Sequence, residues 1–279
     1  MCVDLKSLMI CRDSSAHYKQ FYQIGKSGKP RLIEQPIGVL DQVHSRIASL
    51  LVRVAPPEYM HSGIKKRSHV TNAKCHSETP GRMLTTDLKA FFPSTAKNKI
   101  FCFFHVKMKT SSDVADLLSE ICTCNHHIPT GSRLSMPLAL WANIDMFNEL
   151  DRVAKSLNIK MTVFVDDITF SGENVNKLFL STISKIILRN GHIPHPEKTV
   201  LYSAHGAKLV TGVVLKNNQL LIKNEQHQKI YQDIEQLKAF KYSQPPHSLK
   251  ERLLGRLHSL SLIDPRLKDK ARSISDINN

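Results

Sequence analysis

The sequence has no long hydrophobic run and few of the residues that mark specialised classes of chain. No window approaches about 18 consecutive apolar residues, which excludes a membrane-spanning helix. Six cysteines in 279 residues are too few and too scattered for a disulfide scaffold. The N-terminal stretch lacks the basic head and apolar core of a secretory signal. We therefore expect a cytoplasmic protein with reduced thiols and no membrane association.

Acidic residues are scarce relative to basic ones. The chain has 24 Asp and Glu against 39 Lys and Arg, which gives a formal net charge of +15. Its 41% hydrophobic and 23% charged residues are ordinary for a globular protein and exclude wholesale disorder. A basic excess attracts polyanions because it neutralises phosphates and releases counterions, which predicts nucleic acid as the partner. The basic residues are spread along the whole chain, which favours a lined channel over a basic tail.

One group of cysteines and histidines invites a metal assignment. It consists of Cys122, Cys124, His126 and His127. The spacing differs from that of a zinc knuckle, and no second Cys/His pair follows at the expected distance. We interpret this segment as a loop.

Hydrophobic periodicity predicts helices that alternate with short strands. We expect an α+β fold in which one sheet is packed by helices. The predicted helices span residues 39–55, 133–157, 174–190, 225–240 and 249–262. The predicted strands span residues 82–87, 161–171, 201–203, 207–215 and 219–222, with a hairpin turn at Asn217-Asn218.

Three carboxylates stand in similar settings on two of these strands. Asp166 and Asp167 lie between two apolar half-strands, as expected for a hairpin with acids at its tip, and Asp87 ends another apolar strand. An isolated acidic pair could be ordinary turn chemistry, but the third acid favours a joint site. Three carboxylates can hold two hard divalent cations, so we expect two Mg²⁺ ions, for which Mn²⁺ can substitute. Two such metals with a polyanionic substrate are typical of nucleotide polymerisation.

The order of motifs along the chain resembles that of the bacterial retron-type reverse transcriptases. The resemblance covers about residues 15–260. It is carried by KPRLIEQP at 29–36, HSGI at 61–64, NAKCH at 72–76, TDLKAFFPS at 86–94, IPTGSRLSMP at 128–137, FVDD at 164–167, the segment 191–199, and VTG at 210–212. Three departures are Thr130 where the family commonly has Gln, Phe164-Val165 where Tyr-Ala is commoner, and Pro196-Glu197 where an Asn often stands.

This resemblance implies a right-hand polymerase fold with fingers, palm and a small helical thumb. The implied domains are an N-terminal segment and fingers at 1–80, the palm with part of the fingers at 81–222, and the thumb at 223–279. It also implies an RNA-directed DNA polymerase of a retron. Such an enzyme binds a cognate structured noncoding RNA, primes from a 2′-hydroxyl and copies part of that RNA into single-stranded DNA from dNTPs. A separate effector protein and a role in antiphage defence are implied as well.

The resemblance assigns roles to individual residues. Asp87, Asp166 and Asp167 would be the catalytic, metal-binding triad. Nucleotide binding would involve Arg31 at the triphosphate, Phe92 against a ribose 2′-hydroxyl, Gly131 where the backbone approaches the nucleotide or template, and Lys198 at the leaving pyrophosphate. RNA binding would involve Asn72, His76, Val210, Thr211 and Gly212.

The same residues and motifs allow more than one interpretation. Phe92 could be a core ring, Arg31 and Lys198 could be solvated surface residues, and Asn72 and His76 could order the fingers. A group II intron maturase would carry an added RNA-binding domain after the thumb, which we do not expect here. The chain could also be another bacterial defence-associated reverse transcriptase or a non-catalytic RNA-binding relative, although all three aspartates of the triad are present.

Overall fold

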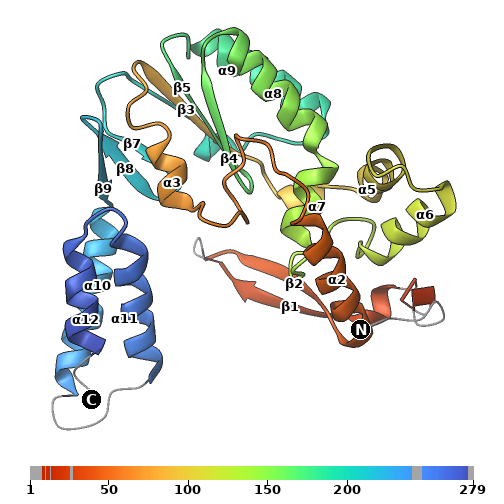
Figure 1. The fold of residues 1–279 in the computed structure, drawn as a ribbon, viewed down its shortest axis with the longest axis horizontal. Helices are drawn as coiled ribbons and strands as arrows, with labels where there is room; N and C mark the ends of the chain where they lie inside the picture. Colours follow the sequence, from red (N-terminus) through yellow and green to blue (C-terminus); the bar gives the residue numbers. More distant parts are fainter. Residues whose placement is uncertain (1–7, 10, 13, 26–27, 241–246, 276–279) are drawn as a thin grey trace.

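The computed structural model describes residues 8–9, 11–12, 14–25, 28–240 and 247–275. Its described part combines helices with three antiparallel sheets, so the predicted α+β class is confirmed. In Figure 1 the largest sheet lies at the top with helices packed beside it, and two smaller units lie below it on opposite sides. None of the helices in the described ranges is both long and apolar enough to cross a membrane.

The central sheet has four strands in the order β4-β5-β3-β6, and every neighbouring pair is antiparallel. Apolar and β-branched residues make these strands, and most of the side chains of β4 and β5 are buried. A two-residue turn joins β4 to β5, as predicted for the acidic hairpin. The strands are β3 (Arg82–Asp87), β4 (Lys160–Phe164), β5 (Asp167–Gly172) and β6 (Val200–Tyr202).

Helices α7 (Ser135–Ala142), α8 (Ile144–Ser156) and α9 (Lys177–Arg189) cover the central sheet, and α8 and α9 lie beside each other in Figure 1. The prediction of one helix over 133–157 is wrong, because the chain breaks at Asn143. The Asn143 amide donates to the Ala139 carbonyl and, at 2.9 Å, to the Thr95 hydroxyl. These side-chain bonds hold the junction between α7 and α8.

The N-terminal part forms a long two-stranded hairpin followed by α2, which lies beside it in Figure 1. Periodicity did not predict the hairpin because most of its strand residues are exposed and many are polar. The elements are β1 (Tyr18–Ile24), β2 (Pro30–Pro36), α2 (Gly38–Leu51) and α3 (His69–Lys74). Between β3 and α7 lie α4 (Phe91–Ser94), α5 (Lys97–Cys102), the π-helical η2 (Phe103–Lys107) and α6 (Ser112–Ile121).

The C-terminal part consists of a three-stranded sheet and three helices that pack on one another. The predicted strand over 207–215 is interrupted by a turn at Thr211-Gly212, where both residues have positive φ. The turn at Asn217-Asn218 forms as predicted, also with two positive φ angles. The elements are β7 (Lys208–Val210), β8 (Val213–Lys216), β9 (Gln219–Ile222), α10 (Asn224–Ala239), α11 (His247–Leu260) and α12 (Arg266–Ser275).

Candidate active site

Three aspartates converge where the central sheet ends. Asp87 is the last residue of β3, and it pairs across the ladder with Asp167, the first residue of β5. Asp166 lies in the turn just before Asp167, and its carbonyl accepts from the Leu88 amide at 3.0 Å. One carboxylate oxygen from each aspartate lies within 4.8 Å of the others. Three hard oxygen donors this close together fit a divalent cation such as Mg²⁺ or Mn²⁺.

The electrostatics of the site favour a bound cation. Burial raises the pKa of the Asp167 carboxyl to about 7, and the negative charges of Asp166 and Asp87 add to this effect. Burial and the charge of Asp87 also raise the pKa of Asp166. Arg31 and Lys198 act in the opposite direction on Asp166. A divalent cation would relieve the repulsion among the three carboxylates.

A lysine adds a positive charge beside the triad. The Nζ of Lys198 lies 2.7 Å from Oδ2 of Asp87, whose side chain is almost fully buried. The bond to Asp87 and the charges of the triad raise the pKa of Lys198, against the lowering effect of partial burial. The backbone of the same segment is fixed on β3, because the His195 amide donates to the Asp87 carbonyl at 2.7 Å. The lysine is therefore held charged and at the triad.

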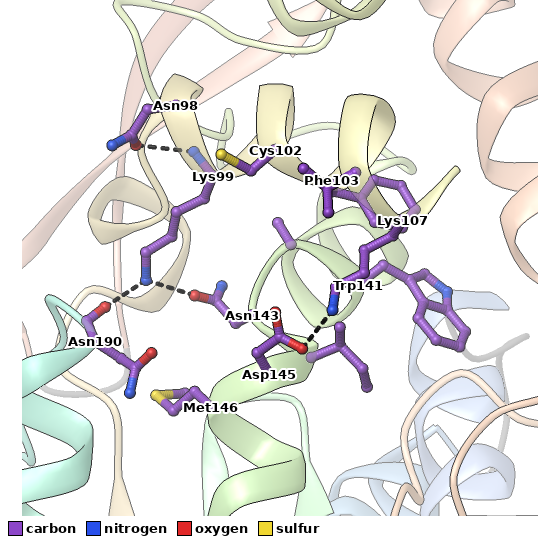
Figure 2. A pocket seen from close by; sticks show the side chains of 13 residues that line it. Asn98, Lys99, Cys102, Phe103, Lys107, Trp141, Asn143, Asp145, Met146 and Asn190 are labelled. Carbon is purple, nitrogen blue, oxygen red and sulfur yellow. Dashed lines mark hydrogen bonds and ion pairs between the residues drawn. The ribbon is translucent and has the colours of Figure 1, made fainter. Parts of the chain in front are cut away.

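A pocket of about 310 Å³ lies away from the triad, between α5, η2 and the α7–α8 junction (Figure 2). At its wall the Lys99 ammonium donates to the Asn143 side chain at 2.7 Å and to the Asn190 carbonyl, and burial lowers its pKa to about 8. The network ties α5 to the end of α9, where the segment that carries Lys198 begins. Sequence reasoning missed Lys99, because only the tertiary structure shows that this lysine is partly buried and bonded to Asn143 and Asn190.

The other predicted nucleotide-binding residues lie in different surroundings. Arg31 is exposed on β2, yet its charge acts on Asp166. Phe92 is half-buried, with its ring centroid 5.8 Å from that of Phe91. Phe91 itself is buried in the core against Phe147. Phe92 therefore keeps a partly free ring near the end of β3.

Gly131 lies close against Ile33 and Glu34 of β2. A Cβ at this position would lie 2.8 Å from the Glu34 carbonyl oxygen and 2.9 Å from the Ile33 side chain. The Gly131 amide donates to the same Glu34 carbonyl at 3.1 Å. The hydroxyl of Thr130, which replaces the family's usual Gln, donates to the Leu32 carbonyl at 2.6 Å. This loop is thus docked on β2, which accounts for the glycine without a nucleotide.

The residues predicted to bind RNA lie mostly inside the protein. Asn72 and Val210 are fully buried, and Asn72 reaches the Thr211 hydroxyl at 3.5 Å. His76 is buried between the Ser171 and Thr162 hydroxyls at 2.6 and 2.7 Å, and burial lowers its pKa to about 3. These contacts tie α3 to the sheets. Only Thr211 and Gly212 of the five reach the surface, so the RNA-binding role stays a prediction.

Two further groups of side chains lie outside the triad. The described residues contain one group of side chains close enough to share a metal ion, the aspartate triad, and the Cys122 to His127 segment adds none. In the C-terminal helices Arg252 and Arg256 both pair with Asp233, whose side chain is buried. These arginines are therefore engaged within the helical unit.

Comparison with known proteins confirms the resemblance seen in the motifs. No protein-family model matches the chain. Retron Se72 reverse transcriptase of Salmonella heidelberg is 30% identical over 169 residues, which are 59% of this chain and 44% of that protein. Retron Ec86 reverse transcriptase of Escherichia coli is 24% identical over 233 residues, 82% of this chain and 72% of that protein. Retron Mx65 reverse transcriptase of Myxococcus xanthus is 27% identical over 237 residues, 77% of this chain and 55% of that protein.

This chain therefore spans less than half the length of the Salmonella relative and between about half and three quarters of the other two. Among solved structures, apo telomerase from Candida tropicalis matches with a TM-score of 0.55 at 12% identity, covering 75% of this chain and 55% of that chain. That likeness concerns the fold alone. It agrees with the right-hand polymerase fold expected from the motifs.

Proposed function

We propose that this chain is the RNA-directed DNA polymerase of a retron. The observation that carries the proposal is the convergence of Asp87, Asp166 and Asp167 at one end of the central sheet. The retron type is supported by the relatives, which are all retron reverse transcriptases. In the same proposal residues 1–80 supply the fingers with the N-terminal segment, 81–222 the palm, and 223–279 the thumb.

Different residues of the site would serve different parts of the phosphoryl transfer. Two Mg²⁺ ions, when bound, would activate the attacking hydroxyl and neutralise charge on the leaving pyrophosphate. The three aspartates would hold the ions by their carboxylate oxygens. Lys198 stands beside Asp87 with a proton that it can donate to the leaving pyrophosphate. Arg31 is suited to grip the triphosphate because a guanidinium makes bidentate bonds to phosphate oxygens.

The substrate and product follow from the retron type. The enzyme copies part of a cognate structured noncoding RNA into single-stranded DNA, priming from a 2′-hydroxyl and leaving a branched RNA–DNA. Recognition of such an RNA depends on shape and 2′-hydroxyls more than on base edges in a groove, and the net charge of +15 suits a polyanion. A separate effector protein, a bacterial cytoplasmic location and a role in antiphage defence complete the proposal.

The test is to purify the protein from cells that carry its native flanking DNA and to analyse the bound nucleic acid on a denaturing gel. The controls are an Asp166→Asn/Asp167→Asn variant and Asp145→Asn, which removes an exposed carboxylate paired with Lys107. A discrete DNA that shifts after RNase treatment, absent only from the triad variant, is the expected result. RNA without DNA in every sample would contradict polymerase activity and favour an RNA-binding relative. DNA without attached RNA would contradict the retron type.

A further inference from the structure

The turn that carries Asp166 contains an unusual backbone conformation. Val165, the first of the two turn residues, has φ +61°. Branching at Cβ makes this left-handed region unfavourable for valine. A two-residue hairpin turn with positive φ at its first position ordinarily has glycine there. Contacts outside the turn must therefore hold Val165 in place.

A segment far away in the sequence runs along the free edge of β4. The Val163 amide donates to the Tyr59 carbonyl at 2.7 Å, and the His61 amide donates to the Val163 carbonyl at 2.8 Å. Met60 and Val163 form a parallel bridge. Two residues further along both segments, this register places Ser62 level with Val165.

Ser62 binds the turn directly at that point. Its Oγ accepts from the Val165 amide at 3.0 Å and donates to the Met60 sulfur at 3.3 Å. Ser62 is buried, so water competes little for either bond. The next residue, Gly63, has φ +67°, and a Cβ there would lie 2.3 Å from the end of the Met136 side chain. Glycine adopts this positive φ without strain, which suits position 63 to turn the chain away after Ser62.

We propose that Ser62 is a positioning residue that holds the Val165–Asp166 turn in its left-handed conformation and thereby directs the Asp166 carboxylate toward Asp87 and Asp167. The turn is fixed from two sides. The Ser62 hydroxyl accepts from the Val165 amide on one side, and the Leu88 amide donates to the Asp166 carbonyl on the other. Without the hydroxyl, the valine can leave the left-handed region and move the carboxylate out of the group. The inference deepens the proposed function and rests on it for its catalytic consequence.

The experiment measures binding of Mn²⁺ alone to the purified protein by electron paramagnetic resonance, without nucleic acid. Ser62→Ala is expected to weaken Mn²⁺ binding about three- to tenfold, the effect of one lost hydrogen bond on the position of a ligand. The matched control is Ser119→Ala on α6. It also removes a buried serine hydroxyl, which in this case donates to the Asp116 carbonyl. That control should bind Mn²⁺ as the unchanged protein does.

A second pair of variants separates positioning from general destabilisation. Glycine adopts positive φ without help, so in the Val165→Gly background the Ser62→Ala change should leave Mn²⁺ binding unaltered. This comparison still applies if Ser62→Ala alone does not fold. Equal Mn²⁺ affinity of Ser62→Ala and the unchanged protein would overturn the inference. An equal loss in both backgrounds would overturn it too, because Ser62 would then act elsewhere.

DNA synthesis by the same variants separates this inference from the proposed function. Mn²⁺ binding that follows the expected pattern, in a protein that makes no DNA, would refute the polymerase and support the turn. DNA synthesis that depends on Asp166 but is unaffected by Ser62→Ala would refute the role of Ser62 and leave the polymerase standing.

Discussion

The Lys198 ammonium and the Asp87 carboxylate form an ion pair of 2.7 Å at the triad, and the Asp87 end of that pair is buried while the lysine is partly exposed. The pair links two parts of the chain that are 111 positions apart. It brings a proton donor to the same place as the acidic oxygens. The charge of Lys198 also opposes the rise that burial and the neighbouring carboxylates cause in the pKa values of Asp166 and Asp167.

Replacing this lysine should change the pH dependence of DNA synthesis. In Lys198→Gln the pKa values of Asp166 and Asp167 rise, so the acid limb of the rate profile moves to higher pH, and the maximal rate falls because the proton donor is lost. The profile is measured from about pH 5.5 to 9 beside Lys177→Gln, an exposed lysine on α9. An unchanged profile with an unchanged maximal rate would remove Lys198 from the mechanism.

The ring of Phe92 is expected to discriminate between sugars. Phe92→Ala should increase incorporation of ribonucleotides relative to deoxyribonucleotides, because the space next to a 2′-hydroxyl opens. The ratio is measured by primer extension with each nucleotide type. Phe91→Leu is the matched control, since Phe91 is buried against Phe147 and its loss should lower the melting temperature without changing the ratio. A Phe92→Ala enzyme that still excludes ribonucleotides would show Phe92 to be a packing residue.

The 130–132 loop can lie close against β2 because Gly131 has no side chain. In Gly131→Ala the new Cβ would meet the Glu34 carbonyl at 2.8 Å, so the loop must move away from β2. We expect weaker dNTP use, seen as a higher KM, with a loss of stability of about 1 to 3 kcal/mol. Gly255→Ala is the control, because nothing lies within 4 Å of its Cβ and alanine favours a helix interior. Equal KM values and melting temperatures for the two variants would contradict this account.

The burial of His76 predicts how stability depends on pH. Its pKa falls from the ordinary value of 6.5 to about 3 in the folded protein, so the unfolded chain binds more protons between these values. Stability that is fully present above pH 6.5 is therefore lost as the pH falls toward 3, by at most about 1.4 kcal/mol per pH unit for this group. His76→Gln should be less stable at pH 7 and show a shallower decline from about pH 6.5 to 4. Thermal unfolding across that range checks it, and parallel curves would contradict it.

The sequence predicted the parts of the fold that local patterns determine. The two apolar half-strands around Asp166 and Asp167 predicted the acidic hairpin, and Asn217-Asn218 predicted the separate turn between β8 and β9. The β1–β2 hairpin was missed because it is exposed on most of its length. The break at Asn143 was missed because apolar residues continue on both sides of it, and one of the two bonds that hold the junction goes to Thr95, which is distant in the sequence.

The candidate site was predictable to a similar degree. The three aspartates could be named because each stands at the end or turn of an apolar strand. The burial of Asn72 and His76 could not be predicted, because their partners lie on other strands and turns. The same applies to Ser62, which reaches the Val165 amide only after the chain has folded.

The most direct test of the central claim is primer extension on an RNA template with dNTPs and Mg²⁺. The purified protein is compared with Asp166→Asn and with Asp145→Asn, which removes a carboxylate outside the triad. We predict that the unchanged protein and Asp145→Asn make DNA, and that Asp166→Asn loses synthesis at least about a hundredfold, equivalent to about 2.7 kcal/mol of transition-state stabilisation. Asp166→Asn that makes DNA at the rate of the unchanged protein would contradict the assignment of the triad.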